Sequence, residues 1–388
     1  MVTAAFSLAD LRTRPGIKWH RYADDVLPAW IAEMDFGVPE PIERVLRRLT
    51  EEAAYGYEPP TLAPDLAEAF AAHMQARFAW QVDPGLVRPV ADLVQALFVL
   101  VSAFSERGQG VVLQTPIYPP FLNAVRETGR RVVEHRLVDD GSRFVVDSAR
   151  LRDVLAADTP LMLLCNPHNP TGRVFERAEL EAIAAAALEH DAIVVADEVH
   201  ADLIYPGSAH IPFASLGADV AARTVTLTSA TKAYNIPGLR CGLMSFGSSA
   251  LRERFRVAIP DRMLGIVNRF GMEATICAWR ECGGWLDDVM LQLQANRIRL
   301  EQFLTTVLPS IGFHAPEATY LGWLDCSSLH LPGRPQQFFL DQARVALNDG
   351  AEFGPPGLGH VRLNFATAPP ILDEILARMA DAVRRVSR

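Results

Sequence analysis

The sequence predicts an α/β fold in which a large domain holds a mostly parallel sheet and a smaller α+β domain follows it. Two observations lead to this prediction. Apolar runs alternate with helical segments through the middle of the chain, and several runs are continuous, as in strands that helices cover on both faces. Beyond about Trp285 the alternation stops and short mixed elements follow. A chain of 388 residues is long enough for two such domains.

Strands and helices are expected to alternate in the large domain. The helix at Asp92–Phe104 is the most apolar long run; it is too short to span a bilayer and is expected to be buried. An alanine-rich helix is expected at Glu176–His190. The candidate strands are Gly110–Pro116, Arg131–Leu137, Leu161–Pro167, Ala192–Val199, Thr224–Ala230 and Cys241–Gly247.

A long helix over residues 285–308 is expected to leave the large domain. We therefore predict three parts: an N-terminal segment joining the small domain at residues 1–45, the large domain at 46–284, and the small domain at 285–388. The Gly- and Pro-rich stretch Gly350–His360 is expected to be a loop, and a mobile flank of the active site is one role for it.

Composition excludes several classes of function. The formal net charge is -9 with no block of like charge, so binding of nucleic acid through clustered Lys and Arg is not expected. The N-terminus lacks a basic start followed by a sustained apolar core, so neither a secretory signal nor a membrane span is expected. The five cysteines are scattered without a CxxC pair, which indicates a reducing cytoplasm and no zinc site.

Polar side chains follow three of the candidate strands at their carboxyl ends. Ligands bind outside the carboxyl ends of the strands in open α/β sheets, so these side chains are expected to converge on one rim. Taken singly, each has an ordinary explanation as a turn residue, a helix cap or a solvated lysine. The set is Asn166 and Asn169 in "NPHNPTG", Asp197 and His200 in "DEVH", and Ser229, Thr231 and Lys232 in "TSATK".

Pyridoxal phosphate would use all of these groups at once. This cofactor needs a lysine for a Schiff base and an acidic partner for its pyridine nitrogen. Lys232 is the candidate for the first role and Asp197 for the second, since a carboxylate beside a cation favours its charged form. Asn169 could donate to the phenolic oxygen of the ring, with His200 close behind it.

The phosphate group of the cofactor has its own candidate ligands. Ser229 lies three residues before Lys232 and Arg240 eight residues after it, and both are suited to phosphate. The helix that starts in "PVADLVQAL" would add backbone N–H groups from Ala91 and Asp92. The Asp92 carboxylate must then point away from the phosphate, as it would at an N-cap.

These motifs resemble the fold-type I pyridoxal-phosphate enzymes of the class I/II aminotransferase superfamily. Within it the chain is most similar to the MalY/PatB-type carbon–sulfur lyases, which are cystathionine β-lyase-like. The resemblance runs from about Trp19 to the C-terminus. It includes "LPAWIAEMDF", "YGYEPP", "TPIYPPF", "LLCNPHNPTGRVF", "DEVHADL", "SATKAYNIPGLR", "PEATYLGWLD" and "GHVRLNFAT".

The resemblance implies a seven-stranded sheet and further site residues. Tyr118 is expected to stack on the cofactor ring, and Arg362 to hold the α-carboxylate of an amino-acid substrate as a bidentate fork. Tyr57 is expected to reach the phosphate and substrate in the partner subunit, which implies a homodimer with shared active sites. The segment Glu33–Phe36, through Asp35, is expected to contact the substrate.

The leading functional prediction is β-elimination from an S-substituted cysteine such as cystathionine, giving thiol, pyruvate and ammonia. Lys232 would act as the general base at the substrate Cα. The alternative is an aminotransferase, or a specialised enzyme of secondary metabolism acting on an amino acid or S-conjugate. Arg240 favours this alternative because the lyases commonly carry a neutral residue there and aminotransferases an arginine. A third hypothesis is a regulatory protein that retains the cofactor fold.

Overall fold

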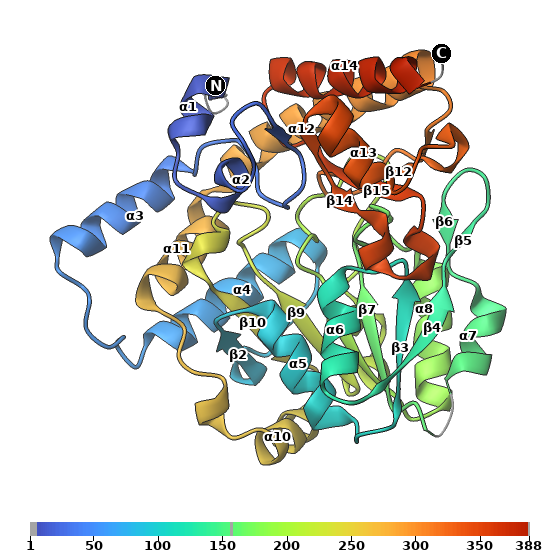
Figure 1. Ribbon diagram of the computed structural model, residues 1–388. Coiled ribbons are helices and arrows are strands. Elements are labelled where there is room, and N and C mark those ends of the chain that lie inside the picture. Colours follow the sequence, from blue (N-terminus) through green and yellow to red (C-terminus); the bar gives the residue numbers. More distant parts are fainter. Residues whose placement is uncertain (1–5, 156–157, 387–388) are drawn as a thin grey trace.

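A computed structural model describes residues 6–155 and 158–386 (Figure 1). Residues 1–5, the start of the segment in which no secretory signal is expected, lie outside the described residues, as do 156–157 and 387–388. The described chain forms a seven-stranded sheet with helices around it and a separate four-stranded sheet. Helices α1 (Leu8–Thr13) and α14 (Pro369–Val386) lie at the same end of the molecule as the smaller sheet.

The large sheet has the order β2-β10-β9-β8-β7-β3-β4. Strand β10 runs antiparallel to both of its neighbours, β2 and β9, and the other six strands share one direction. The prediction of a mostly parallel seven-stranded sheet is therefore confirmed. The strands are β2 (Val87–Val90), β3 (Gly110–Thr115), β4 (Arg131–Arg136), β7 (Leu161–Cys165), β8 (Ile193–Asp197), β9 (Thr224–Thr228) and β10 (Gly242–Phe246).

Helices cover both faces of this sheet because its central strands are apolar on both sides. Successive strand residues point to opposite faces. Leu113 and Leu163 pack in one core with α5 (Leu93–Phe104), α6 (Pro119–Glu127) and α10 (Ser249–Ala258). Val112 and Leu164 pack in a second core with α7 (Ser148–Val154) and α8 (Arg177–Glu189). Within the described chain no helix is long and apolar enough to cross a membrane.

The C-terminal part is built on helix α12 (Gly283–Val307) and a sheet in the order β11-β12-β15-β14. The N-terminal segment joins it through β1 (Leu27–Pro28), which pairs in parallel with β13 (Val345–Ala346). The limits 1–45, 46–284 and 285–388 remain predictions. The four strands are β11 (Gly312–Phe313), β12 (Leu321–Asp325), β14 (Asn348–Asp349) and β15 (His360–Asn364). The remaining elements include α2 (Ile17–His20), α3 (Glu40–Glu51), α4 (Leu62–Phe78), α9 (Ala218–Ala221), α11 (Arg269–Glu281), α13 (Pro335–Phe338), β5 (Val138–Asp139) and β6 (Phe144–Val145).

Two features differ from the expectations. Strand β2 has no counterpart among the candidate strands, since its sequence, Val-Arg-Pro-Val, is short and contains Pro89. Proline is tolerated there because β2 is an edge strand. The stretch Gly350–His360, expected to be a plain loop, forms two 3-10 turns, Gly350–Phe353 and Pro355–Gly357.

Candidate active site

A cavity of about 350 Å³ opens at the edge of the large sheet where the parallel strands end. Because β10 is antiparallel, the residues just before it, and not those after it, reach this edge. A Cβ atom on Gly242, the first residue of β10, would lie 2.6 Å from Leu93 Cδ2, so glycine lets α5 approach the strand. The predicted residues that line the cavity are Ala91, Asp92, Tyr118, Asn169, Asp197, His200, Ser229, Lys232 and Arg240.

Lys232 lies half-buried in the turn after β9, and its Nζ donates a hydrogen bond to the Ala32 carbonyl at 2.9 Å. Burial, and next the nearby Arg362 guanidinium, lower the pKa of Lys232 to about 8. A larger fraction of this amine is therefore neutral at physiological pH than for an exposed lysine. A neutral amine is what a nucleophilic or basic role requires.

Asp197 ends β8 and is buried at the cavity, where its Oδ1 accepts a hydrogen bond from the Val199 N–H at 3.1 Å. Burial raises the pKa of Asp197 to about 7. A nearby cation would restore the charged form. His200 is buried beside the same cavity, and burial lowers its pKa to about 3, so its ring is neutral. Its Nδ1 has no hydrogen-bond partner among the described residues.

Arg362 of β15 is buried and is tied directly to Asn169. Its Nη1 donates to Asn169 Oδ1 at 2.9 Å, and its Nη2 donates to the Trp30 carbonyl at 3.2 Å and to Asn348 Oδ1 at 2.7 Å. Burial lowers the pKa of Arg362 to about 10. Its Nε finds no hydrogen-bond acceptor in the described chain. Arg362 is not itself a lining residue; it contacts the cavity wall through Asn169, whose NH₂ group is left for another ligand.

The start of α5 forms the opposite end of the cavity. Asp92 is the N-cap: its Oδ1 accepts hydrogen bonds from the Val94 and Gln95 N–H groups at 2.7 and 3.3 Å. Its other oxygen pairs with Arg240. The first intrahelical bond comes from the Ala96 N–H, so the N–H groups of Asp92 and Leu93 precede the helix ladder and suit an anion.

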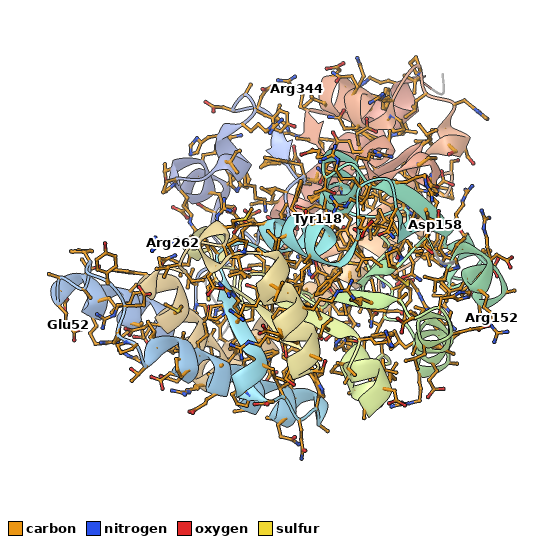
Figure 2. The ribbon with its side chains drawn as sticks, turned by 90° about the horizontal axis from the view of Figure 1, so that it is seen from below. Glu52, Tyr118, Arg152, Asp158, Arg262 and Arg344 are labelled. Atoms are coloured by element: carbon orange, nitrogen blue, oxygen red, sulfur yellow. The ribbon has the colours of Figure 1, made fainter. Side chains whose placement is uncertain are left out.

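Ser229 and Tyr118 complete the set of predicted lining residues. Ser229 Oγ lies 2.8 Å from Thr231 Oγ1 and donates to the Cys241 carbonyl at 2.6 Å. Tyr118 precedes α6, and Figure 2 places it near the middle of the molecule. The Tyr118 N–H donates to the Asn169 carbonyl at 3.1 Å, and burial raises the pKa of the phenol.

Besides Arg362, two predicted site residues do not line this cavity. Tyr57 lies in the segment between α3 and α4, which extends away from the body of the molecule in Figure 1, and its side chain is 96% exposed. Its expected role concerns a partner subunit and remains a prediction. The Asp35 carboxylate is buried elsewhere, 2.8 Å from Lys18 Nζ and 2.7 Å from Trp19 Nε1. Its placement supports a structural role, because these partners hold the N-terminal segment in place.

The N-terminal wall of the cavity lies slightly earlier in the chain than the expected segment Glu33–Phe36. Ala32 and Glu33 line the cavity, and the Ala32 carbonyl accepts hydrogen bonds from both Lys232 Nζ and the Tyr320 hydroxyl, the latter at 3.1 Å. The only signal for this wall is its place in the quoted motif "LPAWIAEMDF". Asn348, the partner of Arg362, carries no signal in the sequence.

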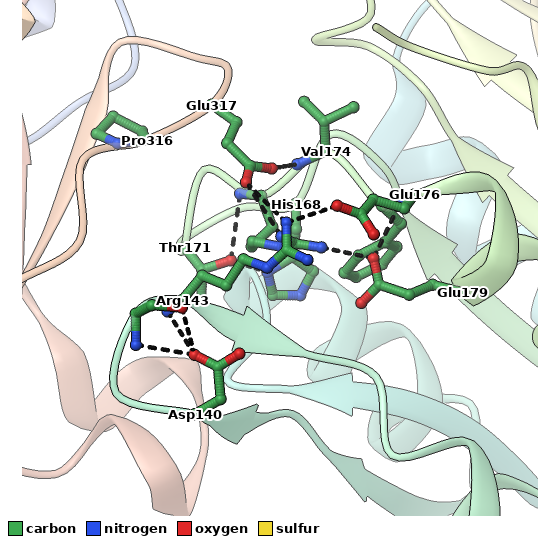
Figure 3. Close-up of polar contacts among 12 residues, drawn as sticks. Asp140, Arg143, His168, Thr171, Val174, Glu176, Glu179, Pro316 and Glu317 are labelled. Atoms are coloured by element: carbon green, nitrogen blue, oxygen red, sulfur yellow. Dashed lines mark hydrogen bonds and ion pairs between the residues drawn. The ribbon is translucent and has the colours of Figure 1, made fainter. Parts of the chain in front are cut away.

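A polar network holds the loop that carries Asn169 (Figure 3). Arg173 is buried and donates to Glu317 Oε1 at 3.0 Å, and its other Nη pairs with Glu179. Glu317 Oε2 accepts a hydrogen bond from the Val174 N–H at 2.8 Å. A Cβ atom on Gly172 would lie 2.3 Å from Pro316 Cβ, so glycine allows the two segments to meet. The network therefore fixes residues 172–174 against the segment that leads to β12.

These residues fit the pyridoxal phosphate that the motifs imply. A lysine with a lowered pKa and a buried carboxylate with a raised pKa share one cavity. Unused N–H groups at a helix start and an arginine lie at one end of that cavity, which suits a phosphate. The buried Arg362 Nε and His200 Nδ1, both without partners among the described residues, are consistent with groups that bind a ligand.

Comparison with known proteins gives matches over nearly the whole chain. Residues 22–379 match the family described as aminotransferase class I and II. Cystathionine beta-lyase PatB of Bacillus subtilis is 34% identical over 377 residues, which cover 95% of each chain. Protein MalY of Escherichia coli is 29% identical over 95% of this chain and 96% of its own.

Solved structures give the same result. The structure of cystalysin from Treponema denticola, which contains a pyridoxal 5'-phosphate cofactor, matches with a TM-score of 0.93 at 28% identity, covering 100% of this chain and 99% of that one. The structure of OvoB matches with a TM-score of 0.92 at 37% identity, covering 99% and 98%. The resemblance drawn from the motifs is thus confirmed, and the chain belongs to the aminotransferase class I and II family, with MalY and PatB among its relatives.

Proposed function

We propose that this protein is a pyridoxal-phosphate-dependent carbon–sulfur β-lyase that cleaves cystathionine or a related S-substituted cysteine. The observation that carries the proposal is the Lys232 amine, with a pKa of about 8, in one cavity with Asp197 and Asn169. The naming of several relatives as cystathionine beta-lyases supports the reaction type.

Each end of the cofactor would have its own ligands in this site. Asp197 would pair with the pyridine nitrogen, the Asn169 NH₂ group would donate to the phenolic oxygen, and Tyr118 would lie against the ring. Ser229, Arg240 and the N–H groups at the start of α5 would hold the phosphate. When bound, the cofactor supplies an electron sink for the electrons left at the substrate Cα after proton loss.

The protein's own groups would then direct the elimination. Arg362 holds the substrate α-carboxylate through donors that the Asn169, Trp30 and Asn348 contacts leave free. The neutral Lys232 amine accepts the Cα proton. The Cβ–S bond breaks, the sulfur keeps the bonding electrons and leaves as a thiolate, and water converts the remaining three-carbon amine to pyruvate and ammonia.

The test uses the fact that the chain contains only two lysines, Lys18 and Lys232. Purified protein is mixed with pyridoxal phosphate, reduced with borohydride and digested, and the labelled peptide is identified by mass spectrometry. We expect the label on Lys232, because Lys18 is buried against Asp35. The loaded protein should release pyruvate and thiol from cystathionine catalytically. A label on Lys18, or no pyruvate, would contradict the proposal.

An aminotransferase is the second candidate, and Arg240 at the cavity is the observation that favours it. The aspartate aminotransferase of Pyrococcus abyssi is also a relative, at 28% identity. A panel of amino donors with 2-oxoacid acceptors separates the two reactions. Steady exchange of amino groups without release of thiol or ammonia would favour this candidate.

We further infer a homodimer in the cytoplasm. Tyr57 and its neighbour Tyr55 are exposed on the segment between α3 and α4, where a partner subunit could cover them. All five cysteines are free and buried, which is consistent with a reducing compartment. Light scattering of the purified protein tests the dimer.

A further inference from the structure

The Glu33 side chain is a charged group of the cavity that the proposed mechanism does not use. Three carboxylates line this cavity: Asp92, Asp197 and Glu33. Asp92 caps α5 and pairs with Arg240, and Asp197 accepts a hydrogen bond from the Val199 N–H. The Glu33 carboxylate has no hydrogen bond or ion pair among the described residues, although Glu33 is half-buried. A carboxylate in this position is a ready acceptor for a cationic ligand group.

The backbone around Glu33 is fixed, so its side chain is presented at a defined place. The Glu33 carbonyl accepts hydrogen bonds from Lys18 Nζ at 2.9 Å and from Asn364 Nδ2 at 2.7 Å. The next residue, Met34, is held at its N–H by Asn235 Oδ1 at 3.0 Å. A Cβ atom on Gly16 would lie 3.8 Å from Glu33 Oε1. Gly16 is exposed, so this contact places the carboxylate near the surface of the molecule.

Glu33 also lies next to the reacting end of the cavity. Lys232 Nζ donates to the carbonyl of Ala32, the residue before it, and the Glu33 charge opposes the fall in the pKa of Lys232. The other cations nearby have partners of their own: Lys18 pairs with Asp35, and Arg362 is bonded to Asn169, Trp30 and Asn348. A substrate whose Cα lies at Lys232 would therefore share its cavity with the Glu33 carboxylate, which pairs with no cation among the described residues.

We propose that Glu33 determines specificity by binding a cationic group, such as an ammonium, at the far end of the S-substituent of the substrate. This inference rests on the proposed β-lyase function and names its substrate class. A neutral substituent of the same length would leave the Glu33 carboxylate unpaired, and an anionic substituent would be repelled by it. The expected substrates are S-substituted cysteines with a distal amine, and simple S-alkyl cysteines are expected to be poor substrates.

The test compares substrates of equal shape and different charge. S-(2-aminoethyl)-L-cysteine carries the distal ammonium, and S-propyl-L-cysteine is its neutral isostere. We expect kcat/KM of the loaded wild-type enzyme to be about tenfold or more higher for the ammonium substrate, as for a charge-assisted hydrogen bond. Glu33→Gln should abolish this ratio, because kcat/KM should fall far more for the ammonium substrate than for S-propyl-L-cysteine. Glu43→Gln, which removes an exposed carboxylate of α3, is the matched control and should keep the ratio.

A binding measurement makes the test independent of turnover. L-Lysine and L-2-aminoheptanoate have the same shapes as the two substrates and no leaving group. Calorimetric titration should show tighter binding of L-lysine to the wild type and equal binding of both to Glu33→Gln.

The possible outcomes separate this inference from the proposed function. Pyruvate from both substrates with an unchanged ratio in Glu33→Gln, or an equal loss for both, would overturn the role of Glu33 and leave the lyase function standing. No pyruvate from cystathionine or from either of these substrates would overturn the function, and the titrations would then decide the role of Glu33 alone.

Discussion

At the scale of single residues, Lys232 is set up for reaction by its surroundings. Burial lowers its pKa from 10.5 to about 8. Only the neutral amine attacks an aldehyde, so the rate of cofactor attachment should rise with pH up to about 8 and level off above it. Stopped-flow absorbance of the cofactor-free protein mixed with pyridoxal phosphate between pH 6.5 and 10 measures this rate. A rate that keeps rising up to pH 10, as for an exposed lysine, would contradict the lowered pKa.

Asp197 shows the opposite shift, and its stability effect has a definite sign. Burial raises its pKa from 3.8 to about 7, so the folded cofactor-free protein holds this proton more tightly than the unfolded chain does. Stability is therefore lost as pH rises from about 4 through 7. Asp197→Asn should stabilise the cofactor-free protein at pH 8 by about 1–3 kcal/mol and have little effect below pH 4.

The same substitution should reduce turnover, because asparagine cannot neutralise a protonated pyridine nitrogen. We expect kcat to fall by about 100-fold or more. Urea unfolding at pH 4 and pH 8, together with pyruvate release, measures both effects. If Asp197→Asn is less stable than the wild type at pH 8, the charged Asp197 carboxylate does not destabilise the folded protein, and the prediction is wrong.

Two acidic residues, two positions apart, show the limit of sequence reasoning at this scale. Lys232, Asp197 and Asn169 could be predicted because each follows a strand at its carboxyl end, which is a local rule. No such local rule states which of the two residues, Glu33 or Asp35, lies at the cavity. Asp35 turns toward Lys18 and Trp19 and Glu33 lies at the cavity, because distant residues such as Asn235 and Asn364 fix the backbone path between them.

At the scale of elements, the start of α5 combines a cap with an ion pair. Asp92 caps the helix and also pairs with Arg240, so its negative charge lies where a phosphate is expected. Asp92→Asn keeps a capping side chain and frees Arg240 for the phosphate. The Kd for pyridoxal phosphate should fall about three- to tenfold at low salt, and less at high salt. Fluorescence titration of the cofactor measures this change.

Asp92→Ala provides the contrast, because it also removes the cap. It should lower the free energy of unfolding by about 1 kcal/mol. Weaker cofactor binding in Asp92→Asn would instead indicate that the ion pair positions Arg240 for the phosphate.

The direction of β10 explains why some elements of the site were harder to predict than others. The six strands named from the sequence were apolar enough to stand out, and all six exist. Strand β2 was missed because it is short and contains Pro89, yet it forms the edge that leads into Ala91 and Asp92. Whether Arg240 reaches the cavity depends on β10 running antiparallel, and a strand's own sequence does not state its direction.

The loop between β7 and α8 is held by an ion pair between Arg173 and Glu317, which are 144 residues apart. Because Arg173 is buried, removing its partner should lower the free energy of unfolding more than removing one residue of an exposed ion pair does. A double-mutant cycle with Arg173→Gln and Glu317→Gln should give a coupling free energy of about 1–3 kcal/mol in urea unfolding. The exposed pair of Arg384 and Asp381 is the control and should give less than about 1 kcal/mol. Equal coupling in the two pairs would show that burial adds nothing.

At the scale of the whole molecule, the surface beside the α3–α4 segment exposes several large apolar and aromatic side chains. Tyr55, Tyr57 and Ile266 are 68%, 96% and 69% exposed, and they gather beside a second cavity that Phe270 also lines. Grouped apolar side chains of this kind are typical of an interface. The active-site cavity of the same chain does not include Tyr57. The proposed dimer accounts for both facts if Tyr57 completes the site of the partner subunit.

Shared sites make a prediction that separate sites cannot match. Lys232→Ala and Tyr57→Ala chains are co-expressed with two different tags, and the mixed dimer is purified by both tags. If Tyr57 serves the partner's Lys232, one of the two sites contains both native residues, and the mixed dimer should have about half of the wild-type activity although each parent is inactive at limiting cofactor. The inverse mixture, a wild-type chain with a Lys232→Ala/Tyr57→Ala chain, should be inactive because each site then lacks one of the two groups. If each site is instead built from one chain, all of its native groups come from that chain. The first mixed dimer should then be inactive, and the second should have about half of the wild-type activity.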